Sequence, residues 1–258
     1  MKAWNKREWF IILFLIYLYF LLWYNNITVG DIMLEIVVKY FLYFIIYSFA
    51  GWCIEMVYQS IKDKHIVNRG FLIGPVCTIY GYGVLLIVLL IGTNTKDLLA
   101  VFLKAILVCS ILEYMTSYVM EKVFKARWWD YSDEKFNING RICLGTMIPF
   151  GLGGTFIVYI AHPIVVNFVN KFSMNTLTII AGILFVIFLV DNIISFGVLN
   201  KIKKQITYVK KDSTEIIRDK VMDWLGHNTI LFRRLKSAYP TFKITARLNK
   251  ALEKYKKK

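Results

Sequence analysis

Apolar residues gather in six long blocks along the chain, and short polar stretches separate them. The blocks cover Trp9–Trp23, Ile36–Ile61, Phe71–Ile91, Leu98–Met120, Ile142–Val169 and Leu177–Leu199. The last five are long enough to cross about 30 Å of hydrocarbon as helices. The first is somewhat short, but the aromatic residues at both of its ends are typical of anchors at the membrane interface. The pattern predicts an all-α polytopic membrane protein, built as a six-transmembrane-helix bundle.

Composition indicates the same class of protein. Of the 258 residues, 57% are hydrophobic, whereas soluble domains have roughly half and do not concentrate it in such blocks. We divide the chain into an N-terminal transmembrane helix with its outer loop (1–35), a five-helix membrane core (36–200) and a basic helical cytoplasmic tail (201–258).

The net charge of +15 lies mostly in that tail, where residues 201–258 carry 17 basic and 5 acidic side chains. Such a block can bind nucleic acid or an anionic membrane surface. Because it directly follows a membrane helix, we expect contact with the lipid bilayer through anionic lipid head groups, and no nucleic acid partner.

The distribution of basic residues also predicts the orientation. With a cytoplasmic N-terminus, the inside segments before the tail carry 11 Lys and Arg, against 4 on the outer side. Basic residues accumulate on the cytoplasmic side of membrane proteins. We therefore expect a multi-pass protein of the cell membrane with both termini in the cytoplasm.

Three acids lie within the predicted spans, where an ionisable side chain is costly and marks a candidate site. Each lies on a polar stripe whose members are three or four residues apart and so share one helix face. The predicted substrate-binding set adds neighbouring polar residues and two arginines at the cytoplasmic ends of spans. It comprises Glu55, Gln59, Arg69, Glu113, Ser117, Arg141, Asp191 and Asn192.

The simpler alternative for these residues is structural. In it, Arg69 and Arg141 pair with the acids and hold helices together without any substrate.

Glycine and proline interrupt two of the apolar blocks. We expect helix breaks at Gly74 and Pro75, and again at Pro149 and Gly151. Interrupted spans at corresponding places in two halves of a chain are typical of transporter binding sites. The alternative is close helix packing through glycine, which is common in membrane bundles.

The longest inside loop contains Trp128, Trp129, Asp130 and Tyr131. One interpretation is that its aromatic rings anchor the loop in the membrane interface. The other is a lid over the cytoplasmic mouth, with Asp130 paired to Arg69 or Arg141.

Other chemistry finds little support in the sequence. The four cysteines lack the spacing of a metal site, and no Gly-Lys-Ser/Thr phosphate-binding loop occurs. We expect no metal, no cofactor and no catalytic residue, and we interpret His162 as a packed or interfacial histidine. An enzyme is therefore the less favoured class.

In combination, several motifs resemble one family. They are Gly51-Trp52 with Glu55, Asn68-Arg69-Gly70-Phe71-Leu72 with Gly74-Pro75, Tyr80-Gly81, Leu112-Glu113-Tyr114, Trp128-Trp129-Asp130-Tyr131 and Asn139-Gly140-Arg141. The chain resembles, over roughly residues 46–200, the multi-pass ABC-transporter type IV (CmpB-like) family, which has eukaryotic transmembrane-protein relatives. The resemblance implies a permease subunit that works with a separate ATPase subunit.

The leading hypothesis is a permease-like protein whose polar cavity faces the cytoplasm and takes a small polar or cationic solute or a lipid head group. An intramembrane lipid-modifying enzyme, with a carboxylate as acid or base, is the second hypothesis. A non-catalytic membrane scaffold that recruits partners through its tail is the third. A homo-oligomer is compatible with each of them.

Overall fold

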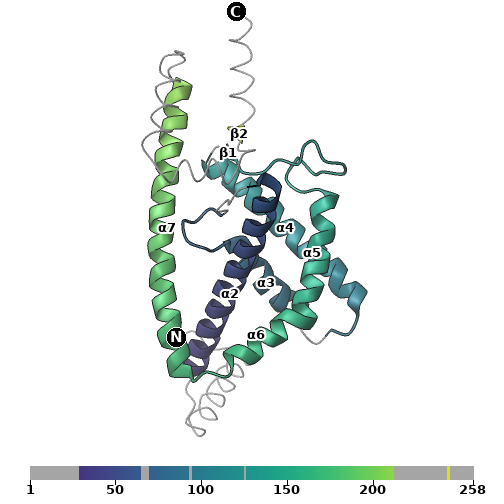
Figure 1. The fold of residues 1–258 in the computed structure, drawn as a ribbon, viewed down its shortest axis with the longest axis vertical. Coiled ribbons are helices and arrows are strands. Elements are labelled where there is room, and N and C mark those ends of the chain that lie inside the picture. Colours follow the sequence, from purple (N-terminus) through teal and green to yellow (C-terminus); the bar gives the residue numbers. More distant parts are fainter. Residues whose placement is uncertain (1–28, 65–69, 93–94, 125, 212–242, 245–258) are drawn as a thin grey trace, which may run out of the picture.

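The computed structural model describes residues 29–64, 70–92, 95–124, 126–211 and 243–244. Over these residues the chain forms a helical bundle (Figure 1). The helices are α2 (Val29–Asp63), α3 (Thr78–Ile91), α4 (Leu98–Phe124), α5 (Leu144–Phe156), the π turn η1 (Ile157–Ala161), α6 (His162–Val169) and α7 (Met174–Lys211). Two-residue strands, β1 (Ala126–Arg127) and β2 (Lys243–Ile244), pair antiparallel.

Four helical stretches in the described part of the chain are long and apolar enough to cross a membrane. They are Gly30–Lys62, Leu98–Val123, Leu144–Val169 and Met174–Gly197. The predicted helical membrane fold is confirmed. The block Trp9–Trp23 and the tail beyond Lys211 lie outside the described residues, so the sixth helix and the helical tail stay predictions.

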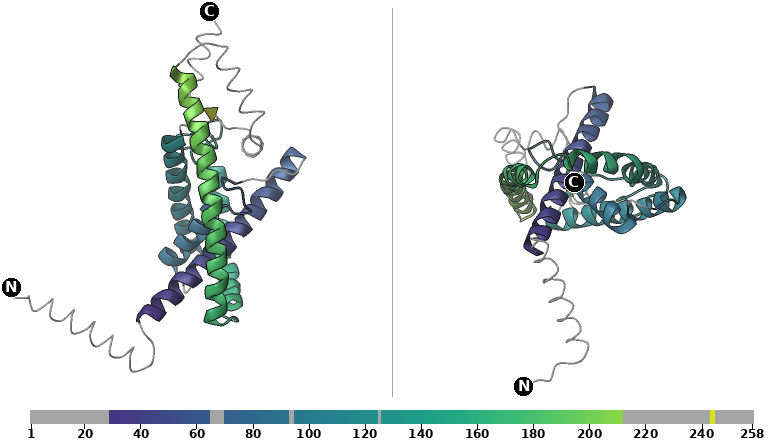
Figure 2. Two further views of the ribbon diagram at one scale, coloured as in Figure 1. Left: turned by 90° about the vertical axis from the view of Figure 1, so that its left-hand side faces the viewer. Right: turned by 90° about the horizontal axis from the view of Figure 1, so that it is seen from below.

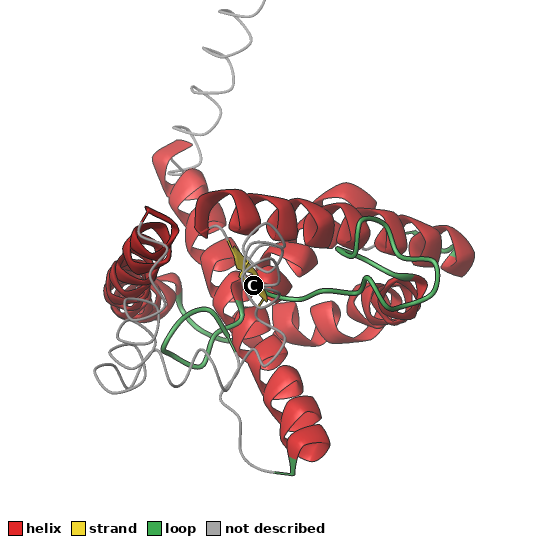
Figure 3. Cartoon of the chain, turned by 90° about the horizontal axis from the view of Figure 1, so that it is seen from above, coloured by secondary structure: helices red, strands yellow, loops and turns green. Residues whose placement is uncertain are grey.

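The helices alternate in direction. α2, α4 and α7 run toward one end of the bundle, and α3 and the α5–α6 helix run away from it (Figure 1). α4 leads at that end into residues 128–143, which we call the cap, and we call this end the cap end. Figure 3 looks onto the cap end, where loops lie across the ends of the helices. The basic loop residues and the end of α7 therefore gather on one side.

The third predicted span is only partly helical. α3 begins at Thr78 and has 14 residues, about 21 Å at 1.5 Å per residue, which is short of the hydrocarbon thickness. Residues 70–77 approach it as a non-helical loop. Pro75 has no N–H and disfavours helical geometry at Gly74. The chain is non-helical at Gly74 and Pro75, and the expectation of a helix from Phe71 is wrong, because α3 begins at Thr78.

The second expected break is wrong. Pro149 and Gly151 lie inside α5, which continues without interruption. A Cβ added at Gly151 would lie 2.6 Å from the Phe102 ring of α4, so this glycine allows close packing of α4 and α5.

This helix is instead interrupted at η1. Pro163 cannot donate a hydrogen bond to the carbonyl four residues before it, and the His162 N–H bonds the Ile157 carbonyl, five residues before it.

α2 lies at the centre of the packing and crosses the bundle obliquely (Figure 2). It packs against α3 and α7, while α4 packs against α3 and α5. One apolar core lies around Leu42, Val84 and Leu177 of α2, α3 and α7. A second lies around Ile87, Ala105 and Val158 of α3, α4 and η1. Both cores keep α2, α3 and α4 in register, which places the polar residues described next.

Candidate functional site

Two of the three predicted acids come together. The Tyr80 hydroxyl of α3 donates to Glu55 Oε1 of α2 at 2.6 Å. The Tyr131 hydroxyl of the cap donates to Glu113 Oε1 of α4 at 3.3 Å. The two carboxylates are close enough to interact electrostatically. We call Glu55 and Glu113 the acid pair.

Glu113 is the more deeply enclosed member of the acid pair. The Glu113 residue is only 6% exposed. Its carboxylate oxygen Oε2 has no hydrogen-bond partner among the described residues. The Thr146 hydroxyl lies beside it but donates to the Cys143 carbonyl oxygen at 2.9 Å. A buried carboxylate oxygen without a partner costs free energy. A bound proton or cation would remove that cost.

Tyr131 is held in the hydroxyl form. Its burial, together with the neighbouring Glu113 charge, raises the pKa of the Tyr131 hydroxyl above its ordinary value. The hydroxyl therefore keeps its proton at neutral pH and remains a donor to Glu113.

The third acid, Asp191, has a different set of partners. Its Oδ1 accepts the Ile73 N–H and its Oδ2 accepts the Gly74 N–H, both at 2.9 Å. The Ser195 hydroxyl donates to Asp191 Oδ1 at 3.1 Å. Asp191 thus fastens the non-helical loop 70–77 to α7. Backbone that is not helical at membrane depth needs such partners inside the protein.

The remaining predicted site residues are distributed as follows. Gln59 is buried on α2, one turn beyond Glu55. Asn192 donates to the Phe188 carbonyl of its own helix at 2.7 Å. Ser117 accepts a hydrogen bond from Arg141 Nη1 at 3.1 Å. Arg69 lies outside the described residues.

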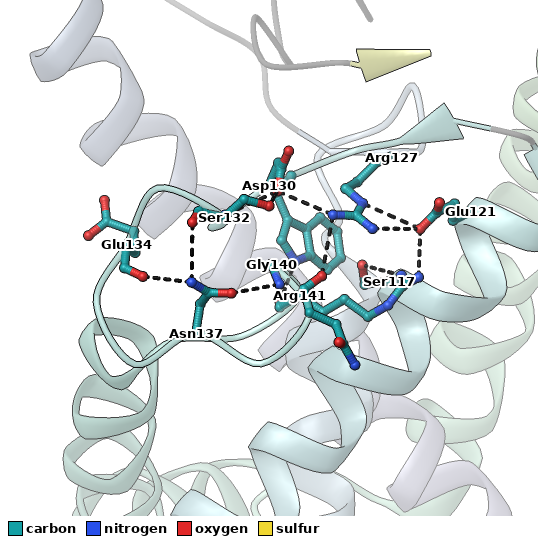
Figure 4. Close-up of polar contacts among 11 residues, drawn as sticks. Ser117, Glu121, Arg127, Asp130, Ser132, Glu134, Asn137, Gly140 and Arg141 are labelled. Carbon is teal, nitrogen blue, oxygen red and sulfur yellow. Dashed lines mark hydrogen bonds and ion pairs between the residues drawn. The ribbon is translucent and has the colours of Figure 1, made fainter. Parts of the chain in front are cut away.

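Arg141 pairs within the cap region (Figure 4). It is 8% exposed, and its Nη2 donates to Glu121 Oε2 at 2.6 Å. The guanidinium also lies over the Tyr118 ring, 5.4 Å from its centroid. The expected pairing of Arg141 with an acid of the predicted site is therefore wrong. Glu121, one turn beyond Ser117 on the same stripe of α4, takes that position.

A second arginine completes this arrangement. Arg127 Nε and Nη2 donate to the same Glu121 Oε2 at 3.3 and 3.2 Å. Arg127 Nη1 reaches Asp130 Oδ1 at 3.2 Å. We call Glu121, Arg127 and Arg141 the cap clamp. Arg127 is thus a partner of Asp130, and Arg141, one of the two expected partners, pairs with Glu121; the other, Arg69, lies outside the described residues.

The rest of the cap is held by its own polar groups. The Asn137 side chain donates to the Ser132 and Glu134 carbonyls and accepts the Gly140 N–H (Figure 4). The Trp129 ring N–H donates to the Arg141 carbonyl at 3.0 Å. Trp128 is buried, with its ring 5.9 Å from that of Phe71. Trp128 therefore packs inside the protein, whereas Trp129 is half-buried and fastens the cap through its ring N–H.

Several residues of this region were not predicted as partners. Tyr80 and Thr146 contact the acid pair, and Glu121 and Arg127 build the cap clamp. One signal for Tyr80 is present in the sequence. Gly51 lies one turn before Glu55 on α2, and a Cβ there would overlap the Tyr80 ring. A glycine at this spacing makes room for a large side chain directed at the acid.

The described residues hold no group of three or more His, Cys, Asp and Glu side chains placed to bind a metal. The acid pair offers only oxygen atoms, which suit a proton or a hard cation.

Comparison with known proteins adds the family. The model of the family described as "Putative ABC-transporter type IV" matches residues 42–196, a stretch that includes the acid pair, the cap clamp and Asp191. Comparisons with curated proteins and with solved structures found no match. With more than half of its length matched, the chain belongs to the "Putative ABC-transporter type IV" family of membrane proteins.

Proposed function

We propose that the protein is a permease-like membrane protein in which Glu55 and Glu113 bind a small cation, a proton included, or a cationic head group. The family supports a transport-related role in the membrane. The single observation that carries the proposal is Glu113 Oε2, a carboxylate oxygen that is buried without a hydrogen-bond partner among the described residues.

The surroundings of Glu113 support a binding role over a purely structural one. A structural acid pairs with a base, as Glu121 does with two arginines. Glu113 has neutral hydroxyl groups beside it instead: Tyr131 donates at 3.3 Å, and Thr146 also interacts with the carboxyl group. Its charge is therefore left for an occupant to neutralise. A nearby second carboxylate, Glu55, strengthens the attraction for a positive charge.

The position of the cap favours a site that is closed at the cap end. It supplies Tyr131 to Glu113 and is fastened by the cap clamp, so access to the acid pair from this end requires the cap to move. The basic residues at the cap end favour its placement in the cytoplasm. In this arrangement the candidate site faces the cytoplasm beneath a lid, and a separate ATPase subunit, as the family description suggests, would bind on the same side.

The first experiment uses dicyclohexylcarbodiimide, an apolar reagent that modifies protonated carboxyl groups in membranes. Purified protein in lipid nanodiscs is treated at constant ionic strength with increasing sodium, potassium or tetramethylammonium, and mass spectrometry quantifies the adduct on Glu113. A bound cation displaces the proton that the reaction needs. We expect at least one cation to reduce the modification of Glu113 about tenfold, equivalent to about 1.4 kcal/mol of binding.

Two controls make the result specific. Glu134 is an exposed carboxyl group of the cap, so its modification should not depend on which cation is present. Glu55→Gln should weaken the protection of Glu113, because the second carboxylate is lost. Modification of Glu113 that is unaffected by every cation would contradict the proposed site.

A further inference from the structure

A buried stripe runs along α2 beyond the acid pair. Its members are four residues apart and therefore share one inclined helix face. Of these members, Tyr43, Tyr47, Gly51 and Gln59 are buried, and Glu55 is half-buried. From first to last the stripe extends about 24 Å at 1.5 Å per residue, most of the hydrocarbon thickness. Tyr47, Glu55 and Gln59 place polar groups on this face, although Tyr43 and Tyr47 also pack in the apolar core. Polar groups inside a membrane helix are costly and mark candidate ion or proton pathways.

A histidine meets the stripe at the end away from the cap. His162 is 5% exposed, and its Nδ1 lies 3.0 Å from the Tyr47 hydroxyl. The Tyr43 ring packs edge-on against the imidazole, with centroids 5.3 Å apart. Of the two interpretations of His162, packed or interfacial, the structure fits the packed one, because the side chain is buried against α2. It also follows directly on η1, and π turns are frequent at functional sites.

A second buried group lies between His162 and the acid pair. Ser48 is adjacent to Tyr47 and fully buried, and its hydroxyl has no hydrogen-bond partner among the described residues. It faces Gly81, where a Cβ would overlap the Ser48 oxygen. On the far side of Gly51, the Tyr80 hydroxyl reaches Glu55. Hydroxyl groups therefore follow α2 from the histidine to the acid pair.

From this arrangement we propose that the stripe conducts protons between His162 and the acid pair. The inference rests on the proposed function and adds to it the identity of an ion that reaches the site and the route it takes. His162 receives protons on the side away from the cap, and Glu55 or Glu113 receives them near the cap.

The transfer at His162 conserves protons and charge. In the tautomer with hydrogen on Nδ1, a proton adds to Nε2, Nδ1 gives its proton to the Tyr47 oxygen, and the Tyr47 hydroxyl releases its own. His162 and Tyr47 end neutral, and an acid-pair carboxylate ends protonated. About 12 Å along α2 separates Tyr47 from Glu55. The Ser48 hydroxyl bonds neither Tyr47 nor Tyr80, so the pathway requires water molecules that connect these three hydroxyl groups to Glu55.

The groups that face His162 allow it to hold a proton only briefly. From α2 these are the Tyr43 and Tyr47 rings. The ionic residues nearest along α2, Glu35 and Lys39, pair with each other at 2.7 Å. None of the described ion pairs includes His162. A protonated His162 is therefore not trapped by a carboxylate and can pass its proton on.

The test measures proton uptake into liposomes that contain the purified full-length protein and the pH-sensitive dye pyranine. Valinomycin and a potassium gradient set the membrane potential. His162→Gln keeps a polar side chain that cannot relay a proton, and Tyr47→Phe removes the hydroxyl. We expect each to slow proton uptake at least about tenfold, since a positioned proton donor or acceptor contributes about 10²–10⁴-fold.

Tyr159→Phe is the matched control, because the Tyr159 hydroxyl on η1 donates to the Thr95 carbonyl, away from the stripe. Its uptake should stay within about twofold of the unmodified protein, a change of no more than about 0.4 kcal/mol in the barrier. Uptake that equals that of empty liposomes, or equal rates in all variants, overturns the pathway. If His162→Gln does not yield folded protein, Tyr47→Phe decides the question.

The carbodiimide measurement separates this proposal from the one on which it rests. Cation protection of Glu113 with unchanged uptake in both relay variants overturns the pathway and leaves the cation site standing. Slow proton uptake in both relay variants, when no cation reduces the carbodiimide modification of Glu113, supports the pathway. The same result contradicts the proposal that the acid pair binds cations other than the proton.

Discussion

At the scale of single residues, Asp191 shows how one carboxylate can hold a non-helical segment at membrane depth. Its two oxygens accept two successive backbone N–H groups of the loop 70–77. Gly74 permits this approach, because a Cβ there would lie 2.7 Å from Asp191 Oδ2. Water is scarce in hydrocarbon, so the Gly74 N–H depends on this side chain, whereas the Ile73 N–H also reaches the Ser195 hydroxyl oxygen at 3.2 Å.

Asp191→Asn should destabilise the protein. The amide keeps one acceptor oxygen but directs an NH₂ group at the second N–H, and a buried donor without a partner costs about 1–3 kcal/mol. Thermal unfolding in detergent should show a lower midpoint. Asn192→Ala is the control, because Asn192 bonds only the Phe188 carbonyl of its own helix among the contacts described. Equal midpoints for the two variants would contradict the role given to Asp191.

The sequence identifies the acids whose burial in the membrane costs free energy, but it does not identify the groups that bond to them. Glu55, Glu113 and Asp191 are recognisable because an acid inside an apolar block requires an explanation. Helical spacing also predicts the α4 face that carries Glu113, Ser117 and Glu121. Partners depend on distances between helices, which the sequence does not contain. For that reason the pairing of Arg141 with Glu121, and the tyrosine donors to the acid pair, were not predicted.

At the scale of elements, the cap is an ordered loop whose attachment is concentrated on one atom. Glu121 Oε2 accepts hydrogen bonds from both Arg127 and Arg141. These arginines begin and end the segment that carries Tyr131. Glu121 is therefore a major attachment of the segment that places the Tyr131 hydroxyl over Glu113, beside the bonds from Arg141 to Ser117 and from Asn139 to the Tyr114 hydroxyl.

Glu121→Gln should loosen the cap. It removes the charge that two partly buried guanidinium groups share, and hydrogen bonds to charged groups are worth about 1.5–3 kcal/mol. Hydrogen–deuterium exchange should become at least about tenfold faster in residues 128–142.

Glu134→Gln is the matched control for the cap clamp. Glu134 is exposed in the same loop, and only its backbone carbonyl accepts one of the cap hydrogen bonds described here. Exchange that accelerates equally in the two variants, or in neither, would show that the cap is held by its other contacts.

The limits of the helices were less predictable than their existence. Apolar blocks of sufficient length predicted α2, α4, the α5–α6 helix and α7, because the hydrocarbon thickness sets a minimum length. Proline alone did not predict the breaks. Pro149 is tolerated inside α5, whereas the chain before Pro75 is non-helical and bonded by Asp191.

At the scale of the whole molecule, the distribution of charge predicts which end is cytoplasmic. Lys135 of the cap and Lys171 between α6 and α7 are both exposed, at opposite ends of the bundle. In intact cells, a membrane-impermeant maleimide should label Lys171→Cys, and should label Lys135→Cys only after permeabilisation. The protein with its four native cysteines gives the background. The reverse pattern would contradict the predicted orientation.

The alternating helix directions also constrain the two ends of the chain. Three described segments run toward the cap end and two run away, so Val29 and Lys211 lie at opposite ends of the bundle. Reporter tags fused before Met1 and after Lys258 thus show whether the chain crosses the membrane an odd or an even number of times. With the tail on the side where α7 ends, the tags report the same compartment only if residues 1–28 add one more crossing. Two tags would therefore decide whether Trp9–Trp23 spans the membrane.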